Sequence, residues 1–310
     1  MWLVYALLAA LCFGLRGILY HWTSQRPIDR NFMLFAVFLS GAVGSLIGTF
    51  VAGHEWTWSV LIGLLMGVFS FSANASMYRG FAVGKASIVA IFTGLPSIIV
   101  ALLAYILWGE TLTVWQLIAL VIIVAGVLCI QYSDEMTVSN LQGLKWGLMA
   151  MLFFGLNDTM GKQAMLLEAD VLPTLFFMFV SGSLLFLGNW LMVGRRTKRT
   201  STASGREQVA AAGDNGQPSA AVKAQAAAAW PLKKVFVWGL VVGLTNVSGM
   251  IFILPAFRLG ATGLVSAVVA LNVLMILFYT RITTRARFRK LELIGIICAF
   301  LGILLLRLFQ

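Results

Sequence analysis

Ten apolar segments, each long enough to cross a lipid bilayer, constrain the fold of this sequence more than any other feature. A helix of about 20 apolar residues spans the roughly 30 Å of a hydrocarbon core. Backbone N–H and C=O groups find no water there, so the segments are predicted to be helices. They cover residues 2–20, 33–52, 58–78, 86–108, 113–131, 145–161, 172–193, 235–255, 262–280 and 290–309. We therefore expect an all-α membrane protein with ten transmembrane helices, placed in the cell membrane.

The composition supports lipid as the surrounding solvent. Hydrophobic residues make up 60% of the 310 positions and charged residues only 11%, whereas about a quarter of a soluble protein is charged. The net charge of +11 does not indicate nucleic-acid binding, because the basic residues lie between the apolar segments and form no single face. The three cysteines, Cys12, Cys129 and Cys298, lie inside apolar segments. Their spacing suggests neither a metal site nor a disulfide framework, and no cofactor is expected.

Positive charges are distributed unevenly between the connections. Eighteen of the 22 Lys and Arg residues lie in odd-numbered connections, three lie on the other side, and Arg16 lies within a segment. Because Lys and Arg accumulate on the cytoplasmic side, this bias predicts that both termini lie outside. Residues 195–234 form the most basic connection and are rich in Ala, Gly and Ser. Such a composition cannot bury enough apolar surface to offset ordering, so we expect a disordered linker.

An internal repeat relates the two halves of the chain. Shifting the sequence by 176 residues places GLLMGVFSFSA (63–73) over GLVVGLTNVSG (239–249), with aligned glycines. The same shift places Asn272 where Pro96 would repeat. Five helices per half is an odd number, so the second half must enter the membrane in the opposite direction. The sequence therefore predicts two inverted five-helix repeats, an arrangement from which many secondary transporters are built.

Residues 81–130 resemble the signature of EamA-type transporters of the drug/metabolite transporter (DMT) superfamily. The shared features include a proline in the fourth helix (Pro96) and a Gly-Glu pair (Gly109 and Glu110) before the fifth. FFGLNDTMGK (153–162) resembles the small and aromatic segment that opens each half in that family.

This resemblance implies two EamA units and a membrane transporter. Ten-helix relatives are usually assigned cytoplasmic termini, the opposite of what the charge bias predicts here. The units and connections are predicted as 1–131 for the first repeat, 132–144 for a connection, 145–194 and 235–310 for the second repeat, and 195–234 for the linker.

Two ionisable residues, Arg16 and Asp158, lie within the apolar segments, where charges are costly and indicate function. The inverted arrangement would place them about 10 Å apart along the membrane normal, given a core of roughly 30 Å. We therefore expect them to contact opposite ends of one polar solute, or water in one cavity, instead of each other. Snorkelling to the membrane surface is the alternative for both. Asp158 is also the natural carrier if transport is coupled to protons.

Other polar residues in the segments are candidates for lining a cavity or for bonding helices together. They are Asn74, Tyr78, Asn157, Asn246, Ser248 and Asn272. Pro96 interrupts the hydrogen bonds of its helix and is a candidate hinge. Glu110 lies at the turn between the fourth and fifth helices, where it could contact a gate, cap a helix or face water.

Together these features predict a secondary transporter, with a membrane-embedded enzyme or a channel as the alternatives. No HExxH or GxSxG pattern suggests catalysis. We expect alternating access at a midplane cavity, efflux as the family resemblance implies, and coupling to protons as a hypothesis. The expected partners are a small metabolite or drug-like solute and the lipid bilayer, with the chain a monomer or homodimer.

Overall fold

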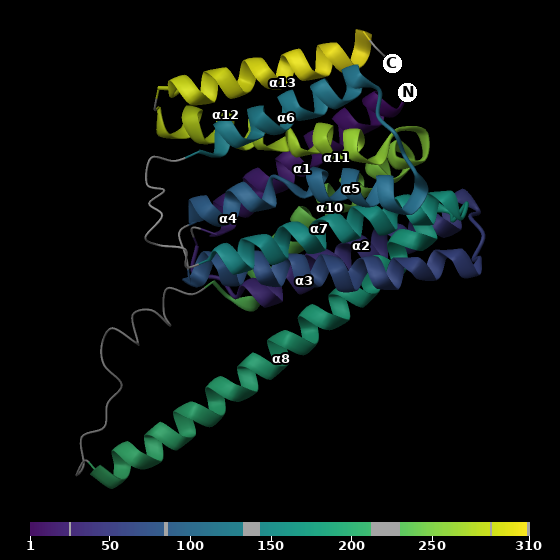
Figure 1. Cartoon of the computed structure of the whole chain (residues 1–310). Helices are drawn as coiled ribbons and strands as arrows, with labels where there is room; N and C mark the ends of the chain where they lie inside the picture. Colours follow the sequence, from purple (N-terminus) through teal and green to yellow (C-terminus); the bar gives the residue numbers. More distant parts are fainter. Residues whose placement is uncertain (25, 84–85, 133–142, 212–229, 286, 309–310) are drawn as a thin grey trace.

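The computed structural model shows a bundle of long helices that run side by side, with both termini at the same end (Figure 1). It describes residues 1–24, 26–83, 86–132, 143–211, 230–285 and 287–308. Every regular element in these ranges is helical. The elements are α1 (Trp2–Ser24), α2 (Arg30–Ala52), η1 (Trp58–Leu61), α3 (Ile62–Val83), α4 (Ala86–Thr93), α5 (Pro96–Trp108), α6 (Val114–Gln131), α7 (Leu144–Leu166), α8 (Val171–Ala211), α10 (Leu232–Leu259), α11 (Thr262–Ala270), α12 (Asn272–Thr284) and α13 (Lys290–Leu308).

The ten apolar segments correspond to these helices. In the described part of the chain, nine helical segments are long and apolar enough to cross a membrane, with α4–α5 and α11–α12 each counted as one. The remaining segment forms α7, which is 23 residues long and packs along α3. Asn157, Asp158 and Lys162 make α7 less apolar than the others. The chain is thus a multi-pass, helical membrane protein.

Two of the segments are broken into half-helices at corresponding places. The first break lies between α4 and α5, where Pro96 is the first residue of α5 and has no N–H to donate. The second break lies at Leu271, between α11 and α12, where Asn272 takes the place of a proline. Leu95 and Leu271 precede the second half-helix in each case and are related by the 176-residue shift. A proline is therefore not required for the second break.

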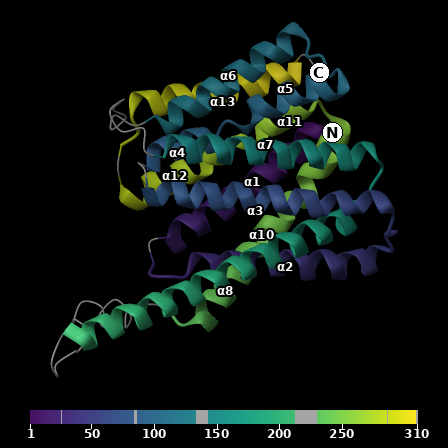
Figure 2. The same ribbon diagram turned by 60° about the horizontal axis from the view of Figure 1, so that its bottom comes forward.

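The main helix pairs of the bundle come from opposite halves of the sequence. α2 packs on α8 and α6 packs on α13, while α3 packs on α7 and α10 packs on α1. α3 also lies against α8, and α10 lies against α2. Both ribbon views show α6 and α13 together at one edge of the bundle (Figures 1 and 2).

Glycines allow two of these pairs to approach closely. A Cβ on Gly243 of α10 would lie 2.5 Å from the Val37 carbonyl oxygen and 2.6 Å from Ser40 Cβ, both on α2. The corresponding Gly67 of α3 lies against the backbone of α8 at Met178. Small residues at such crossings permit the backbone contact that holds membrane helices together. The aligned glycines of the sequence repeat therefore occupy corresponding packing positions.

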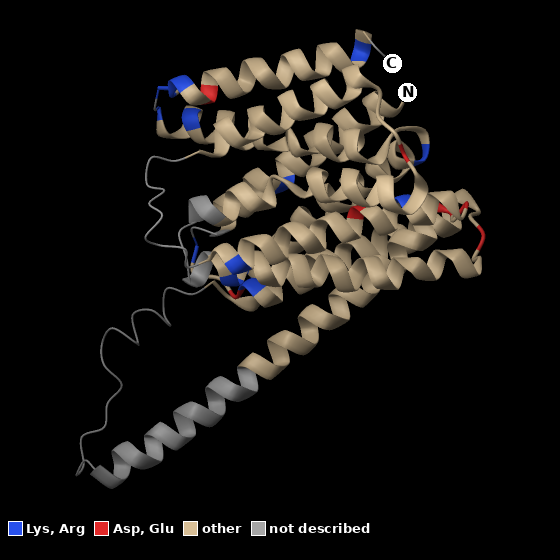
Figure 3. Ribbon diagram, in the orientation of Figure 1, with Lys and Arg blue, Asp and Glu red and all other residues tan. Residues whose placement is uncertain are grey.

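Lys and Arg gather mainly at the end of the bundle opposite the two termini (Figure 3). We call the end that carries most of the Lys and Arg the basic face, and the end with both termini the terminal face. The basic face carries Arg26, Arg30, Arg79, Lys145, Lys233, Lys234, Arg281, Arg285, Arg287, Arg289 and Lys290, as their places in the loops and helix ends require. The terminal face carries the connections with Glu55, Glu110, Glu168 and Asp170.

The predicted linker is shorter than expected at both ends. α8 continues as a helix through Ala211, although disorder was predicted from residue 195. Residues 195–211 mix helix-favouring Arg, Ala, Glu and Gln with Thr, Ser and Gly, which favour helix less. At the other end, the Trp230 N–H donates to the Pro27 carbonyl at 3.1 Å before α10 begins. Residues 212–229 of the linker, and 133–142 of the predicted connection, lie outside the described residues.

Candidate functional site

A cavity of about 130 Å³ lies at the level of the two helix breaks. Its wall comes from α1, α3, α4, α5, α7, α8, α10, α11 and α12, and thus from both halves of the chain. The polar lining residues are Arg16, Ser70, Thr93, Asn157, Asp158, Asn246, Ser266 and Asn272, and the apolar ones are Phe13, Pro96, Phe154, Met178, Met250, Ile253, Val269 and Ala270. Apolar walls with a few convergent polar groups are typical of small-molecule sites.

Arg16 reaches the cavity from α1. Its Nη1 donates to Asn246 Oδ1 on α10 at 2.5 Å, and its guanidinium carbon lies 4.5 Å from the centre of the Phe13 ring. The Nε atom is buried and has no hydrogen-bond partner among the residues that the structure describes. Arg16 is therefore held inside the bundle by α10, with part of its donor capacity unused.

Asp158 reaches the same cavity from α7, on the opposite half of the repeat. Its Oδ2 accepts a hydrogen bond from Ser266 Oγ on α11 at 2.8 Å. Within the described part of the chain, the buried Oδ1 of the neighbouring Asn157 has no hydrogen-bond partner. Among the described residues, no ion pair within 4.0 Å joins Asp158 to Arg16. The cavity thus holds a cation and a carboxylate that do not neutralise each other directly.

Three of the predicted polar candidates lie outside the lining of this cavity. Asn74 donates to Ser70 O of its own helix at 2.8 Å, and Ser248 donates to Leu244 O, also at 2.8 Å. The guanidinium carbon of Arg30 lies over the Tyr78 ring, 5.7 Å from the ring centre. Asn74 and Ser248 thus donate hydrogen bonds to backbone carbonyls of their own helices. The sequence pattern does not distinguish this role from cavity lining.

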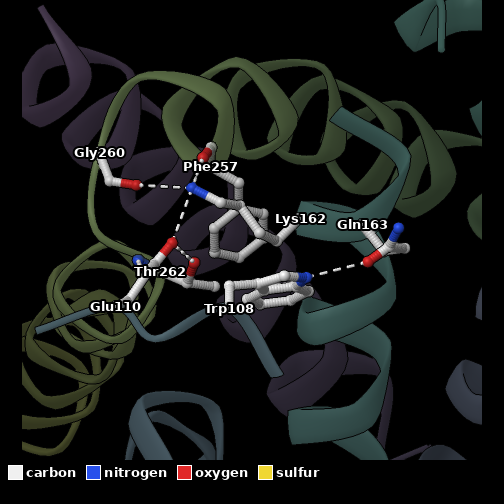
Figure 4. A network of polar contacts seen from close by, with 7 residues as sticks. All are labelled: Trp108, Glu110, Lys162, Gln163, Phe257, Gly260 and Thr262. Atoms are coloured by element: carbon white, nitrogen blue, oxygen red, sulfur yellow. Dashed lines mark hydrogen bonds and ion pairs between the residues drawn. The ribbon is translucent and has the colours of Figure 1, made fainter. Parts of the chain in front are cut away.

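Glu110 takes part in a polar network at the terminal face (Figure 4). Its Oε1 lies 2.9 Å from Lys162 Nζ on α7. Its Oε2 accepts from the Thr262 N–H at 2.8 Å, and its Oε1 accepts from Thr262 Oγ1 at 3.0 Å. Thr262 is the first residue of α11, so the carboxylate caps the start of a helix from the other half of the chain. We call Glu110, Lys162 and Thr262 the clasp.

Lys162 also ties α7 to the end of α10. Its Nζ donates to the Phe257 carbonyl at 2.8 Å and to the Gly260 carbonyl at 3.2 Å. With Glu110 these acceptors match the three donors of an ammonium group. Beside the clasp, Trp108 Nε1 donates to Gln163 Oε1 at 3.0 Å (Figure 4).

Sequence reasoning missed Lys162, Thr262 and Ser266. The predicted apolar segment ends at residue 161, whereas α7 continues to Leu166 and leaves Lys162 only 6% exposed. Its position four residues after Asp158, on the same helical face, was an available signal. Thr262 and Ser266 carry no local signal, since their importance comes from the partners that the fold brings to them.

Comparison with known proteins gives one family and one fold. Residues 1–132 match the family described as "EamA-like transporter family", which belongs to the DMT superfamily. Of 28 matching chains of solved structures, one described only as "Crystal structure of protein" has a TM-score of 0.72 at 11% identity. That match covers 99% of this chain and 96% of the other, and at this identity it shows the fold alone. No curated protein matches the sequence.

Proposed function

We propose that this chain is a secondary transporter that carries a small solute through the central cavity, since residues 1–132 match the EamA-like transporter family. The observation that supports this best is the position of the cavity. It lies between the two halves, at the breaks in two membrane helices, and is lined by an Arg and an Asp. Broken helices around a polar midplane site are a recurring feature of secondary transporters.

The two halves act as inverted repeats in this proposal. The idea is supported by the helix pairs, since α3 with α7 has its counterpart in α10 with α1, and α3 with α8 in α10 with α2. The helix breaks at Leu95 and Leu271 and the glycine contacts of Gly67 and Gly243 add to this support. Two similar halves give a bundle two equivalent ways to pack, one closed at each face.

The packing at the terminal face supports a state that is sealed there. α5 packs on α11, where a Cβ on Gly263 would lie 2.6 Å from Ala101 Cβ. The clasp adds an ion pair between the buried Lys162 and the half-buried Glu110 at the same face. The corresponding half-helices at the basic face, α4 and α12, are not among the closely packed pairs of the described residues.

The burial of the half-helices agrees with this asymmetry. All residues from Thr262 to Val269 of α11 are buried, whereas α12 has no fully buried residue. α12 rests mainly on α1, through Met275 at Gly14 and Ile276 at Gly17. We infer that transport rocks the halves between this state and one in which α4 meets α12 and the clasp is open.

We further propose that Asp158 carries the coupling proton. It is the carboxylate that lines the described cavity, and its Oδ2 is held by a neutral hydroxyl, Ser266. In proteoliposomes with an imposed pH gradient, Asp158→Asn should abolish the dependence of solute flux on the gradient. Ser248→Ala, a change outside the cavity lining on α10, should leave the dependence intact. Gradient-driven flux in Asp158→Asn equal to that of the unchanged protein would reject the coupling.

Catalysis and channel activity make different predictions for the same preparation. An enzyme would form product in detergent solution, where no gradient exists. A channel would equilibrate solute without saturation and without exchange across the membrane. Saturable exchange of labelled for unlabelled solute, with no product formed, is the result that transport requires. The family resemblance favours efflux. The direction of solute flux, measured in vesicles where the orientation of the inserted protein is known, tests it.

A further inference from the structure

We propose that a groove at the basic face binds one anionic phospholipid. The groove lies between α12, the end of α6 and the start of α13, and it has a volume of about 350 Å³. We call it the α12 groove. It shares no lining residue with the central cavity, so the inference does not depend on what that cavity carries. Because α6 and α13 form an edge of the bundle (Figures 1 and 2), lipid can reach the groove from the side.

Much of the lining of the α12 groove is apolar. Val273, Ile276 and Leu277 line it from one face of α12, and Ile130 lines it from α6. From Val273 to Arg281, which also lines the groove, the helix rises about 12 Å, at about 1.5 Å per residue. One leaflet supplies about half of the roughly 30 Å of hydrocarbon. The groove therefore has the length that part of one acyl chain in the basic-face leaflet would fill.

The two threonines of the lining add little polarity to it. Thr280 Oγ1 donates to the Ile276 carbonyl at 2.7 Å, and Thr284 Oγ1 donates to the Thr280 carbonyl at 2.8 Å. Both hydroxyl protons are thus used within α12, as is common for Ser and Thr in helices. The α12 groove is accordingly better suited to an alkyl chain than to a polar solute.

An ion pair lies beside the groove where α12 ends. Arg281 Nε donates to Glu292 Oε2 on α13 at 3.0 Å, and Arg281 Nη2 donates to Glu292 Oε1. The Arg289 N–H also donates to Glu292 Oε2, at 2.9 Å. The carboxylate in the lining is therefore neutralised by its partners, so it presents little repulsion to an anion.

The turn between α12 and α13 carries an excess of positive charge (Figure 3). Three of its cations, Arg285, Arg287 and Lys290, are exposed and form no ion pair within the described part of the chain. Basic clusters at the cytoplasmic ends of membrane helices bind the phosphate headgroups of anionic lipids. Since the cluster adjoins an apolar groove, the two together fit a phosphate that is joined to an acyl chain. They fit free phosphate and a neutral lipid less well.

The reactivity of a cysteine in the groove tests the proposal. Thr284 is exposed and lines the groove, while Thr283 is exposed and lies outside the lining. Thr284→Cys and Thr283→Cys are made separately in a full-length chain whose three native cysteines have been replaced. Each is purified in detergent micelles, and its rate of reaction with a maleimide is measured as dioleoyl phosphatidylglycerol is added. Reaction of Thr284→Cys should slow severalfold and reach a plateau, whereas reaction of Thr283→Cys should change little.

Charge at the turn should set the affinity for the lipid. One variant combines Arg285→Gln, Arg287→Gln and Lys290→Gln, and its control removes the same charge elsewhere on the basic face with Arg26→Gln, Arg79→Gln and Lys233→Gln. The first should raise the lipid fraction needed for half-protection at least about tenfold, since each cation near an anionic lipid contributes about fivefold. The control should shift it much less.

The groove itself is tested with Leu277→Trp, which fills the lining without changing its charge. This variant should lose the protection by phosphatidylglycerol while the basic turn is intact. It separates binding in the groove from attraction of lipid to the charged surface alone.

Several results with Thr284→Cys would overturn the inference. Dioleoyl phosphatidylcholine could protect equally well, or protection could rise without a plateau. Inorganic phosphate or glycerophosphoglycerol, the headgroup without chains, could protect as well as the lipid does, which would indicate an anion site only. A cysteine that is unreactive before lipid is added would show that this chain or a second copy already fills the groove.

Discussion

Lys162 shows how a single residue acquires a role that its position in the sequence does not suggest. It lies near the end of α7, where a lysine could reach the membrane surface, yet it is buried and contacts Glu110 and two carbonyls of α10. Removing one partner of a fully buried pair costs about 3–5 kcal/mol, and the cost is smaller here because Glu110 is only half-buried. The clasp is thus well suited to bias one packing of the bundle over another.

Replacing Lys162 with Met should weaken the sealed state at the terminal face, because Glu110 would remain there without its cation. A cysteine at Ala101, on the α5 side of the seal, reports this in a chain whose three native cysteines have been replaced. We expect its reaction with an impermeant maleimide, added at the terminal face, to become at least tenfold faster.

Lys233→Met is the control, since Lys233 is exposed on the basic face. Adding Glu110→Gln to Lys162→Met should change the rate little further, because the two residues act as one unit. Independent, additive effects of the two changes would contradict the clasp.

At the scale of elements, helix packing and helix continuity follow different rules. The sequence repeat aligns Gly67 with Gly243, and in the structure both glycines lie at close contacts between two helices. The positions of the two helix breaks are not explained by the neighbouring residues alone. Pro96 explains the first break by its missing N–H, whereas Leu271 precedes Asn272 and breaks its segment without a proline. Packing around α11, which is buried along its length, must supply the second break.

Gly243→Val should destabilise the pair of α10 and α2, because the new side chain would meet the Val37 carbonyl and Ser40. Such overpacking costs typically about 1–3 kcal/mol. The measurement is reversible unfolding in mixed micelles with increasing denaturing detergent. The matched control is Gly188→Val on α8, where an added Cβ meets nothing within 4 Å. Equal losses in the two variants would show that the crossing does not require a glycine.

At the scale of the whole molecule, the distribution of Lys and Arg predicts how the bundle is oriented in the membrane. The basic face gathers most of the Lys and Arg of the described residues, while the terminal face carries acidic connections (Figure 3). Because Lys and Arg accumulate on the cytoplasmic side, the sealed face with its clasp is predicted to lie outside, and the cavity to communicate with the cytoplasm.

A phosphatase fused to the chain tests this orientation, since the enzyme is active only outside the cytoplasm. Fusion after Gln310 should give activity, and fusion after Tyr132, which ends α6 at the basic face, should give none. Activity of the second fusion alone would reverse the orientation, in line with what is usual for ten-helix relatives of the family.

The sequence by itself determined the number and position of the membrane helices, because an apolar run of that length has no stable place outside lipid. It also singled out Arg16 and Asp158, since a charge in such a run is conspicuous. Only the tertiary structure decided which polar groups meet. It left Asn74 and Ser248 bonded to their own helices and joined Glu110 to Lys162 and Thr262, because such contacts depend on how distant segments pack.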